Sequence, residues 1–180
     1  ALTVSNIAIV ESVAKDMGCE VRFLVLGWRD PGMPQIERPN LSVFPMVGKT
    51  IVQPGGLHAK VRECDLVLDI SGGDSFADIY GSKRFMFNVL SKLVVMAAGK
   101  PLLLSPQTIG PYQRLWARTA ARFLMKRAAA VVTRDELSID YARSLGITTA
   151  LGATDVAFRL PYEKAVAGSR DKVKVGLGRI

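Results

Sequence analysis

The chain has 180 residues, 49% of them hydrophobic, and its 24 Lys and Arg outnumber 16 Asp and Glu to give a formal net charge of +8. It can bury the core of one ordinary domain, and no apolar run reaches the roughly 18 residues that a membrane-spanning helix requires. Cys19, Cys64 and a single histidine are too few for a disulfide framework or a Cys/His zinc site. We therefore expect reduced, buried thiols, no bound metal and, from the charge, an anionic partner.

Apolar runs bounded by glycine, proline and polar residues predict the order of the elements. Helices are expected at 5–17, 57–63, 84–98, 113–128 and 135–145, and strands at 20–26, 41–45, 65–70, 100–105, 130–134 and 148–151. Strands that alternate with helices of roughly 10–15 residues indicate a parallel sheet. The sequence therefore predicts an α/β fold, Rossmann-like, with a mostly parallel sheet covered by helices.

The two ends of the chain suggest a domain that belongs to something larger. The first residues already follow a helical pattern, and "DKVKVGLGRI" at the other end begins a new strand pattern. We expect residues 1–168 to form an N-terminal domain without its first strand. Residues 169–180 would be a hinge and the first strand of a second domain. No charged-then-apolar export signal is present, so a cytoplasmic protein is expected.

The stretch "DLVLDISGGDSFADIYG" joins a strand at 65–70 to a glycine-containing loop. Ligands of open α/β sheets bind at the carboxyl ends of the strands, and glycines let the backbone approach a ligand closely. The candidate substrate-binding residues here are Ser71, Gly72, Gly73 and Ser75, with Asp74 as the first candidate for catalysis. The alternative is a tight turn in which Asp74 or Ser75 caps the next helix. The loop lacks the lysine of a phosphate-binding P-loop.

Two later loops are expected at the same edge of the sheet. In the segment 105–112, two prolines and a glycine predict a rigid turn that presents Gln107, Thr108 and Gly110 as further candidates, unless it is a plain entry to the next helix. At 133–138, Thr133 is expected to cap a helix with Glu136 three residues on. Capping does not account for Arg134, whose guanidinium suits a carboxylate or a phosphate near the helix N-terminus. Asp155, in a fourth loop, is expected to cap a turn, and the alternative is a side chain that faces the cleft.

The helix at 113–128 carries a basic stripe of residues spaced four apart: Arg114, Arg118, Arg122 and Lys126. Its apolar residues, Leu115, Trp116, Phe123 and Leu124, together with Thr119, are expected to pack on the sheet. A solvated helix face is one explanation of the stripe. The other is a surface for anionic lipid headgroups or a lipid-phosphate acceptor. Nucleic acid is disfavoured because no aromatic residues interleave with the cations.

Four motifs in this order resemble the polysaccharide pyruvyl transferase family: "DLVLDISGGDSFADIYG", "GKPLLLSPQTIGPY", "AAAVVTRDELSIDYARSLGI" and "ATDVAF". The resemblance runs from about Asp65 to Phe158. Two features depart from the family pattern. The "G-N-x-G-D" segment that members usually carry first is absent, and Asp74 replaces the third glycine often found after the strand.

The resemblance implies an enzyme that moves the enolpyruvyl group of phosphoenolpyruvate onto sugar hydroxyls, giving a pyruvate ketal on a cell-surface glycan or its lipid-linked precursor. It implies no cofactor and a two-domain architecture similar to GT-B glycosyltransferases. Arg134 would bind the donor, the loops at 71–76 and 105–111 would line the cleft, and the other donor-binding Arg and His would lie in a C-terminal half. Peripheral contact with the inner face of the membrane is compatible with such an acceptor.

Two other function classes remain open at this point. One is a nucleotide-sugar glycosyltransferase of the same architecture, because the fold alone does not separate the two chemistries. The other is a non-catalytic module that binds glycans or membranes.

Overall fold

The computed structural model describes residues 2–27, 38–71 and 75–159. The helices are α1 (Leu2–Asp16), α2 (Gly48–Val52), α3 (Leu57–Arg62), α4 (Ser82–Ala97), α5 (Leu115–Arg127) and α6 (Glu136–Ser144), with a 3₁₀ helix η2 (Val156–Arg159). The strands are β1 (Phe23–Gly27), β2 (Leu41–Pro45), β3 (Val67–Asp69), β4 (Ser75–Phe76), β5 (Leu102–Ile109), β6 (Ala130–Thr133) and β7 (Leu151–Gly152). Residues 169–180, where a second domain was expected to begin, lie outside the described part.

All strand pairs in the described residues are parallel, which confirms the α/β prediction. The strands form two sheets rather than the single one expected: a β1–β2 pair, and a larger sheet in the order β3–β5–β6–β7 with β4 added beside the end of β5. Local sequence patterns identify strands, but pairing depends on long-range contacts that they do not contain. The division into two sheets was therefore beyond the sequence prediction.

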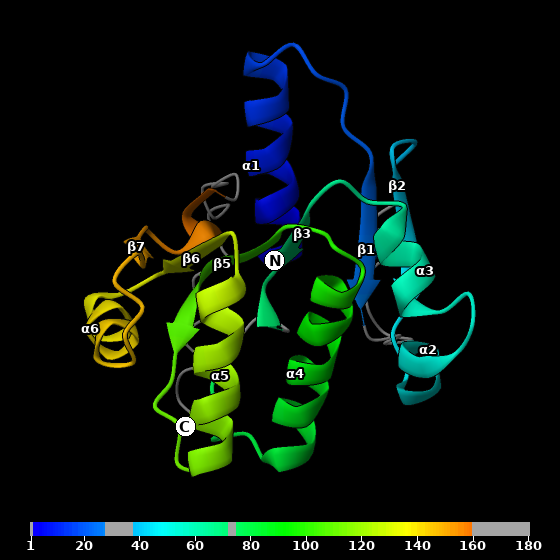
Figure 1. Cartoon of the computed structure of the whole chain (residues 1–180). Helices are drawn as coiled ribbons and strands as arrows, with labels where there is room; N and C mark the ends of the chain where they lie inside the picture. The colour runs from blue at the N-terminus through cyan, green and yellow to red at the C-terminus, as the bar shows by residue number, and fades with distance from the viewer. Residues whose placement is uncertain (1, 28–37, 72–74, 160–180) are drawn as a thin grey trace, which may run out of the picture.

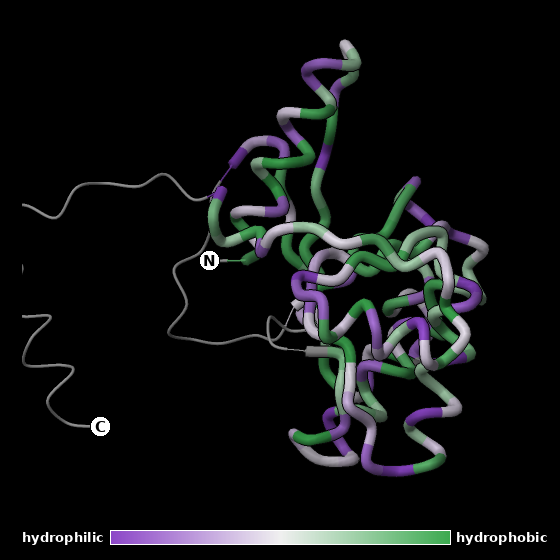
Figure 2. The backbone as a smooth tube through the Cα atoms, turned by 90° about the vertical axis from the view of Figure 1, so that its left-hand side faces the viewer, coloured by the Kyte–Doolittle hydropathy of each residue, from purple (hydrophilic) through white to green (hydrophobic). Residues whose placement is uncertain are grey.

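Helices α4 and α5 lie side by side and cover one face of the larger sheet, while α1 lies away from them and contacts η2 (Figure 1). Along the helices, hydrophobic and hydrophilic residues alternate (Figure 2). The core between α4, α5 and the sheet contains the fully buried Phe76, Phe85, Leu104 and Leu124. Phe85 stacks on Phe76 with ring centroids 5.4 Å apart and meets Trp116 at 5.5 Å, so aromatic contacts join β4, α4 and α5.

Strand β5 is longer than expected and contains the segment that was predicted to be a rigid turn. It runs through Gln107 and Thr108 to Ile109. Pro106 cannot donate a ladder hydrogen bond, and the β5–β6 register shifts between Leu104 and Gln107, so the strand accommodates the proline in an irregularity and continues.

The packing prediction for α5 is wrong for most of its residues. Leu115, Trp116, Thr119 and Phe123 are exposed, and only Leu124 of that set is buried. The inner face instead consists of Ala117, Ala121, Leu124 and Met125. Small alanines let the helix lie close to the core, and this turns the bulkier residues outward.

The two thiols are free, but the expectation that both are buried is wrong. Cys19 is exposed, since it follows the end of α1, and Cys64 is half-buried. Burial raises the pKa of the Cys64 thiol above its ordinary value, with the neighbouring Glu63 carboxylate adding to the effect.

Candidate functional site

Two polar clusters flank the end of β5. Gln107 and Thr108 are consecutive residues of this strand, so their side chains point to opposite faces of the sheet. Gln107 joins a cluster with Asp69, Ser71 and Lys92, whereas Thr108 joins Arg134. The structure thus brings together the candidates predicted from separate loops, in two groups instead of one.

The first cluster is built around a buried lysine. Lys92 Nζ lies 2.9 Å from Asp69 Oδ2 and donates to Ser71 Oγ at 3.2 Å, and its side chain is 1% exposed. Ser71 Oγ in turn donates to Asp69 Oδ2 at 2.9 Å. Ser71 has a φ of 46°, which is uncommon for a residue with a Cβ, and its side chain is buried. The ion pair therefore holds the point where the Ser71–Phe76 segment leaves the sheet.

Lys92 and Asp69 were not among the predicted site residues. Lys92 lies on the inner face of α4, together with Phe85, Val89 and Val95. These positions are spaced four, three and three apart, so a lysine at 92 interrupts an otherwise apolar face. A charged residue at a buried position of a helix is the signal that could have found it, because a buried charge needs a partner.

The side chain of Gln107 contains a buried acceptor without a hydrogen-bond partner. Its Nε2 lies 3.4 Å from the backbone carbonyl of Asp69 and 3.5 Å from Asp69 Oδ2, which orients the amide. Its Oε1 is buried and has no hydrogen-bond partner among the described residues. An unpartnered buried acceptor costs about 1–3 kcal/mol, so the group is suited to accept from a donor that enters the site.

The second cluster orients the Arg134 guanidinium at the end of β6. Arg134 Nε donates to Thr108 Oγ1 at 2.8 Å, and Nη1 donates to Asp155 Oδ2 at 3.1 Å. No hydrogen bond or ion pair to its Nη2 occurs within the described ranges of the chain. The side chain is 32% exposed, so the cation is fixed on two sides and still reachable from solvent. A fixed fork of this kind suits a planar carboxylate or a phosphate.

The helix that follows Arg134 begins differently from the prediction. The N-cap of α6 is Asp135, whose Oδ1 accepts from the Ser138 amide at 2.8 Å. Thr133, the predicted cap, is instead buried in β6 and donates to the backbone carbonyls of Asp135 and Leu151. Thr108 Oγ1 also lies 3.4 Å from Asp135 Oδ2, and this contact links the cap to the Arg134 cluster. Asp155 Oδ1 accepts from the Ala157 amide at 2.9 Å, which confirms the expected turn cap.

The remaining loop candidates divide into residues with a visible local role and residues outside the described part. Gly110 has a φ of 66°, and a Cβ there would collide with the Tyr141 ring, so its backbone and packing require glycine. The backbone of Ser75 pairs with Thr108 across β4 and β5. Gly72, Gly73 and Asp74 lie outside the described residues.

The basic stripe of α5 is partly used inside the molecule. Arg114 is the N-cap residue of α5, and its Nη1 lies 3.5 Å from the buried carboxylate of Asp78. Asp78 also accepts from the amides of Gln113 and Arg114 at 2.8 and 3.0 Å, so it caps the helix from a distance in sequence. Arg122 Nε donates to the Leu145 carbonyl at 2.9 Å. Arg118 and Lys126 are exposed.

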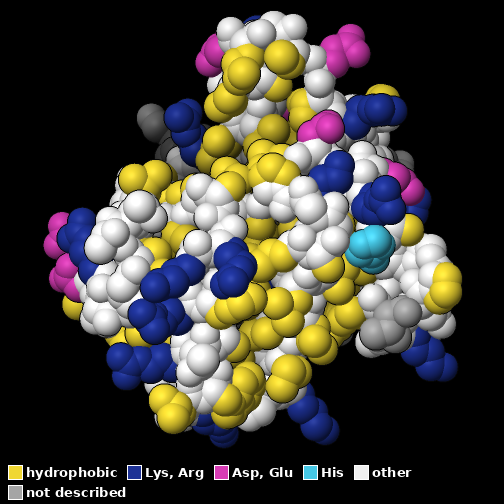
Figure 3. Space-filling model, viewed as in Figure 1, with side chains coloured by type: hydrophobic (Ala, Val, Ile, Leu, Met, Phe, Trp, Pro, Cys, Tyr) yellow, Lys and Arg dark blue, Asp and Glu magenta, His cyan; other side chains and the backbone are white. Residues whose placement is uncertain are grey.

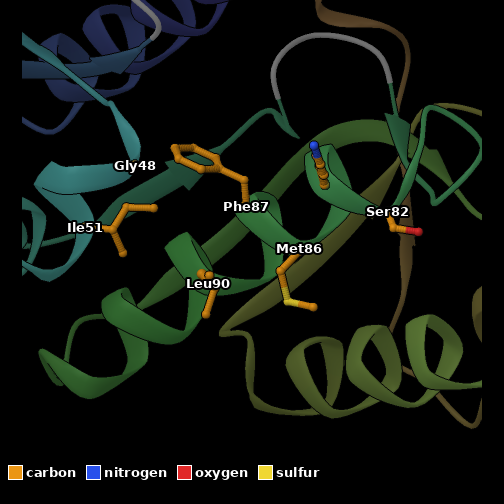
Figure 4. Close-up of a pocket in the computed structure, with 7 residues that line it drawn as sticks. Gly48, Ile51, Ser82, Met86, Phe87 and Leu90 are labelled. Carbon is orange, nitrogen blue, oxygen red and sulfur yellow. The ribbon is translucent and has the colours of Figure 1, made fainter.

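An open pocket of about 410 Å³ lies elsewhere, between α2 and the first half of α4. Figure 4 shows Ile51 of α2 facing Phe87 and Leu90 of α4, with Met86 beside them. This lining is apolar apart from Ser82 and Lys83, so the pocket lacks the several cations that a phosphate with a carboxylate would need. In the described ranges, no group of three or more His, Cys, Asp or Glu could hold a metal ion. No described helix has the length and apolarity to cross a membrane.

These elements define a parallel α/β domain whose polar side chains gather where its strands end, the usual ligand-binding edge of such domains. The family model described as "Polysaccharide pyruvyl transferase" matches residues 9–177, and the chain belongs to that family. This confirms the resemblance drawn from the four motifs.

A curated relative is the "Amylovoran biosynthesis protein AmsJ" of Erwinia amylovora. It is 30% identical over 101 residues, which make up 55% of this chain and 23% of AmsJ. The chain thus matches under a quarter of that relative's length. No solved structure matches the chain significantly.

Proposed function

We propose that this chain forms the N-terminal half of a transferase that moves the enolpyruvyl group of phosphoenolpyruvate onto sugar hydroxyls of a cell-surface polysaccharide or its lipid-linked precursor. Membership of the pyruvyl transferase family supports the reaction class. The similarity to a protein named for amylovoran biosynthesis supports a polysaccharide acceptor. The proposal includes a reaction in the cytoplasm, next to the acceptor.

The observation that carries the proposal is the preorganised Arg134. Its Nε and Nη1 are held by Thr108 and Asp155, and the guanidinium stays accessible. Phosphoenolpyruvate carries a carboxylate and a phosphate, and a guanidinium binds either one through parallel N–H groups. The Lys92 charge is different, because Asp69 neutralises it inside the protein. Arg134 therefore takes the donor anion, and Lys92 supports the loop beside it.

The acceptor lies on the other side of β5 in this proposal. The open Oε1 of Gln107 accepts from a sugar hydroxyl near the Ser71–Phe76 segment. Transfer requires a proton on the methylene carbon of phosphoenolpyruvate and removal of hydroxyl protons from the sugar, while phosphate leaves. Asp74 is assigned to one of these proton transfers. A second half of the protein would provide the other donor-binding cations.

The test is a transfer assay with the full-length protein, phosphoenolpyruvate and a panel of galactose-, mannose- and N-acetylhexosamine-terminated acceptors. A product carrying a pyruvate ketal, with one phosphate released per ketal, is the expected result by mass spectrometry and phosphate detection. Nucleotide sugars serve as control donors. Turnover of a nucleotide sugar without transfer from phosphoenolpyruvate would overturn the proposal in favour of a glycosyltransferase. Inactivity with every donor would favour a binding module.

A further inference from the structure

The outer faces of α4 and α5 carry an unusual number of exposed hydrophobic side chains. Met86, Leu90 and Leu93 on α4 and Trp116 and Phe123 on α5 are each between 37% and 44% exposed, and Leu115 is 79% exposed. The two helices contact each other, so these residues belong to one surface, which we call the α4–α5 face. Isolated exposed leucines are ordinary, but a contiguous group of this kind marks an interaction site.

The charges on the α4–α5 face are all positive. Neither helix contains an Asp or Glu, whereas Lys83, Arg84, Arg118, Lys126 and Arg127 are exposed on them. Figure 3 shows Lys and Arg side chains beside hydrophobic ones over these helices, whereas the acidic side chains of this view lie at its left edge and in its upper part. The surfaces of soluble domains usually mix charges of both signs. A surface that combines apolar side chains with positive charges alone therefore fits a partner that is both anionic and apolar.

The cations and hydrophobic residues are interleaved, so the expectation that no aromatic residues lie among the cations is wrong. The Arg127 guanidinium lies 3.8 Å from the centroid of the Phe123 ring, and Arg84 lies 5.0 Å from that of Tyr80 just before α4. Apolar groups that enter the headgroup boundary and long basic side chains that stay beside the phosphates form the pattern of membrane-surface helices. The apolar pocket next to α4 shares Met86 and Leu90 with this face and extends it toward α2 (Figure 4).

A second copy of the chain fits this surface poorly. A two-fold symmetric contact places the same patch on both sides, so the cations of one copy would face those of the other without a carboxylate from either helix. A nucleic acid would neutralise the positive charge but would leave the Leu and Met side chains without apolar partners. An anionic bilayer complements both the positive charge and the exposed apolar side chains.

We propose that the α4–α5 face docks the protein on an anionic lipid bilayer. This inference rests on the proposed function: docking would bring the enzyme to a lipid-linked saccharide acceptor, which is held at such a surface. Both helices begin at the end toward which β5 points (Figure 1), and Lys92 on the inner face of α4 belongs to the Gln107 cluster. Docking along these helices therefore brings the Gln107 cluster, on the acceptor side in the proposed function, nearer to the headgroups than the Arg134 cluster on the opposite face of the sheet. The basic stripe expected from the sequence is thereby revised: Arg114 and Arg122 make internal contacts, while Arg118, Lys126 and Arg127 carry the charge.

The test measures sedimentation of the full-length protein with vesicles of phosphatidylcholine and phosphatidylglycerol, and with phosphatidylcholine alone. The triple variant Arg118→Gln, Lys126→Gln, Arg127→Gln is expected to partition about a hundredfold less, since each basic side chain near an anionic surface contributes about fivefold. The matched control removes three exposed charges from α1, the segment before β1 and η2: Lys15→Gln, Arg22→Gln, Arg159→Gln. It is expected to change partitioning by less than about tenfold, through long-range attraction alone.

A second variant, Leu90→Gln, Leu115→Gln, Phe123→Gln, keeps the charge and removes exposed apolar groups, so it should bind less even at low salt. All variants should keep the circular dichroism spectrum and the transfer rate to a soluble acceptor, which separates docking from catalysis. Three outcomes would overturn the proposal. They are equal binding to neutral and to anionic vesicles, equal losses of binding in the basic and the control triple variants, and undiminished binding by the apolar variant. Binding to nucleic acid, or a dimer that these substitutions dissolve, without vesicle binding would also overturn it.

Discussion

At the scale of single residues, Arg134 is held on two sides by contacts that a lysine cannot reproduce. The single ammonium of Arg134→Lys keeps the charge but cannot reach Thr108, Asp155 and an anion in one plane. We expect kcat/KM for phosphoenolpyruvate to fall about tenfold to a hundredfold, because hydrogen bonds to charged groups contribute about 1.5–3 kcal/mol. Steady-state kinetics of the full-length protein measure this. Arg143→Lys on the exposed side of α6 is the control, and an equal effect of both substitutions would contradict the role of Arg134.

Lys92 and Asp69 form a buried pair whose members depend on each other. Lys92→Met leaves the Asp69 carboxylate without its cation, and we expect the free energy of unfolding to fall by about 3–5 kcal/mol. Chemical denaturation measures the loss. Removing both charges in Lys92→Met, Asp69→Asn should restore much of it. The control is Lys60→Met, whose pair with Glu63 is largely exposed and should change stability by less than about 1 kcal/mol. A similar loss in both single variants would refute the buried pair.

Tyr112 makes stability depend on pH in the alkaline range. Burial raises its pKa well above the ordinary value, and its hydroxyl has no partner among the described residues. The folded state therefore holds the phenolic proton more tightly than the unfolded state does. Its contribution is fully present below the unfolded pKa of about 10 and is lost as the pH rises through the folded pKa.

In Tyr112→Phe, we expect unchanged or slightly higher stability at neutral pH, by up to about 1 kcal/mol, and a shallower loss above about pH 10. Urea denaturation across this pH range gives the comparison with the parent protein. A steeper slope in Tyr112→Phe than in the parent would show that the sign is wrong.

At the scale of elements, α5 depends on a carboxylate that is far away in the sequence. Asp78 accepts both the Gln113 and Arg114 amides and is buried. Asp78→Ala should lower the free energy of unfolding by about 2–3 kcal/mol, because two helix-terminal amides lose a charged acceptor. Thermal or urea unfolding measures it. The exposed Asp140→Ala on α6 is the control, and a comparable loss there would argue against long-range capping.

The elements also show which patterns the sequence makes visible. Long periodic segments such as α4 and α6 were predicted, whereas α2 and β4 are too short to give a period. The proline in β5 suggested a turn, but pairing with β4 and β6 kept the strand extended. For α5, bulky residues suggested the inner face, while close packing selected the alanines. In each case tertiary contacts decided between alternatives that local propensity left open.

At the scale of the whole molecule, the motifs predicted the family and the edge of the sheet that holds the polar groups, but not how these groups are shared. Consecutive strand residues Gln107 and Thr108 separate them into two clusters, a consequence of β5 extending past Pro106. The Lys92–Asp69 pair joins a helix to a strand and has no local signature. The types of side chain at this edge were thus predictable from the sequence. Which of them come together depends on the packing of the sheet and its helices, which the motifs do not show.

The division of charge between these clusters predicts how much of the reaction residues 1–180 support alone. Phosphoenolpyruvate needs several cations, yet of the two clusters only that of Arg134 offers an accessible cation, because Asp69 neutralises Lys92. We expect residues 1–180 to form no ketal, while the full-length protein transfers. Calorimetry with phosphoenolpyruvate should show binding to residues 1–180 at least about tenfold weaker than to the full-length protein, since the proposed function assigns the other donor contacts to a second half. Ketal formation by residues 1–180 at the full-length rate would place the complete donor site in this half.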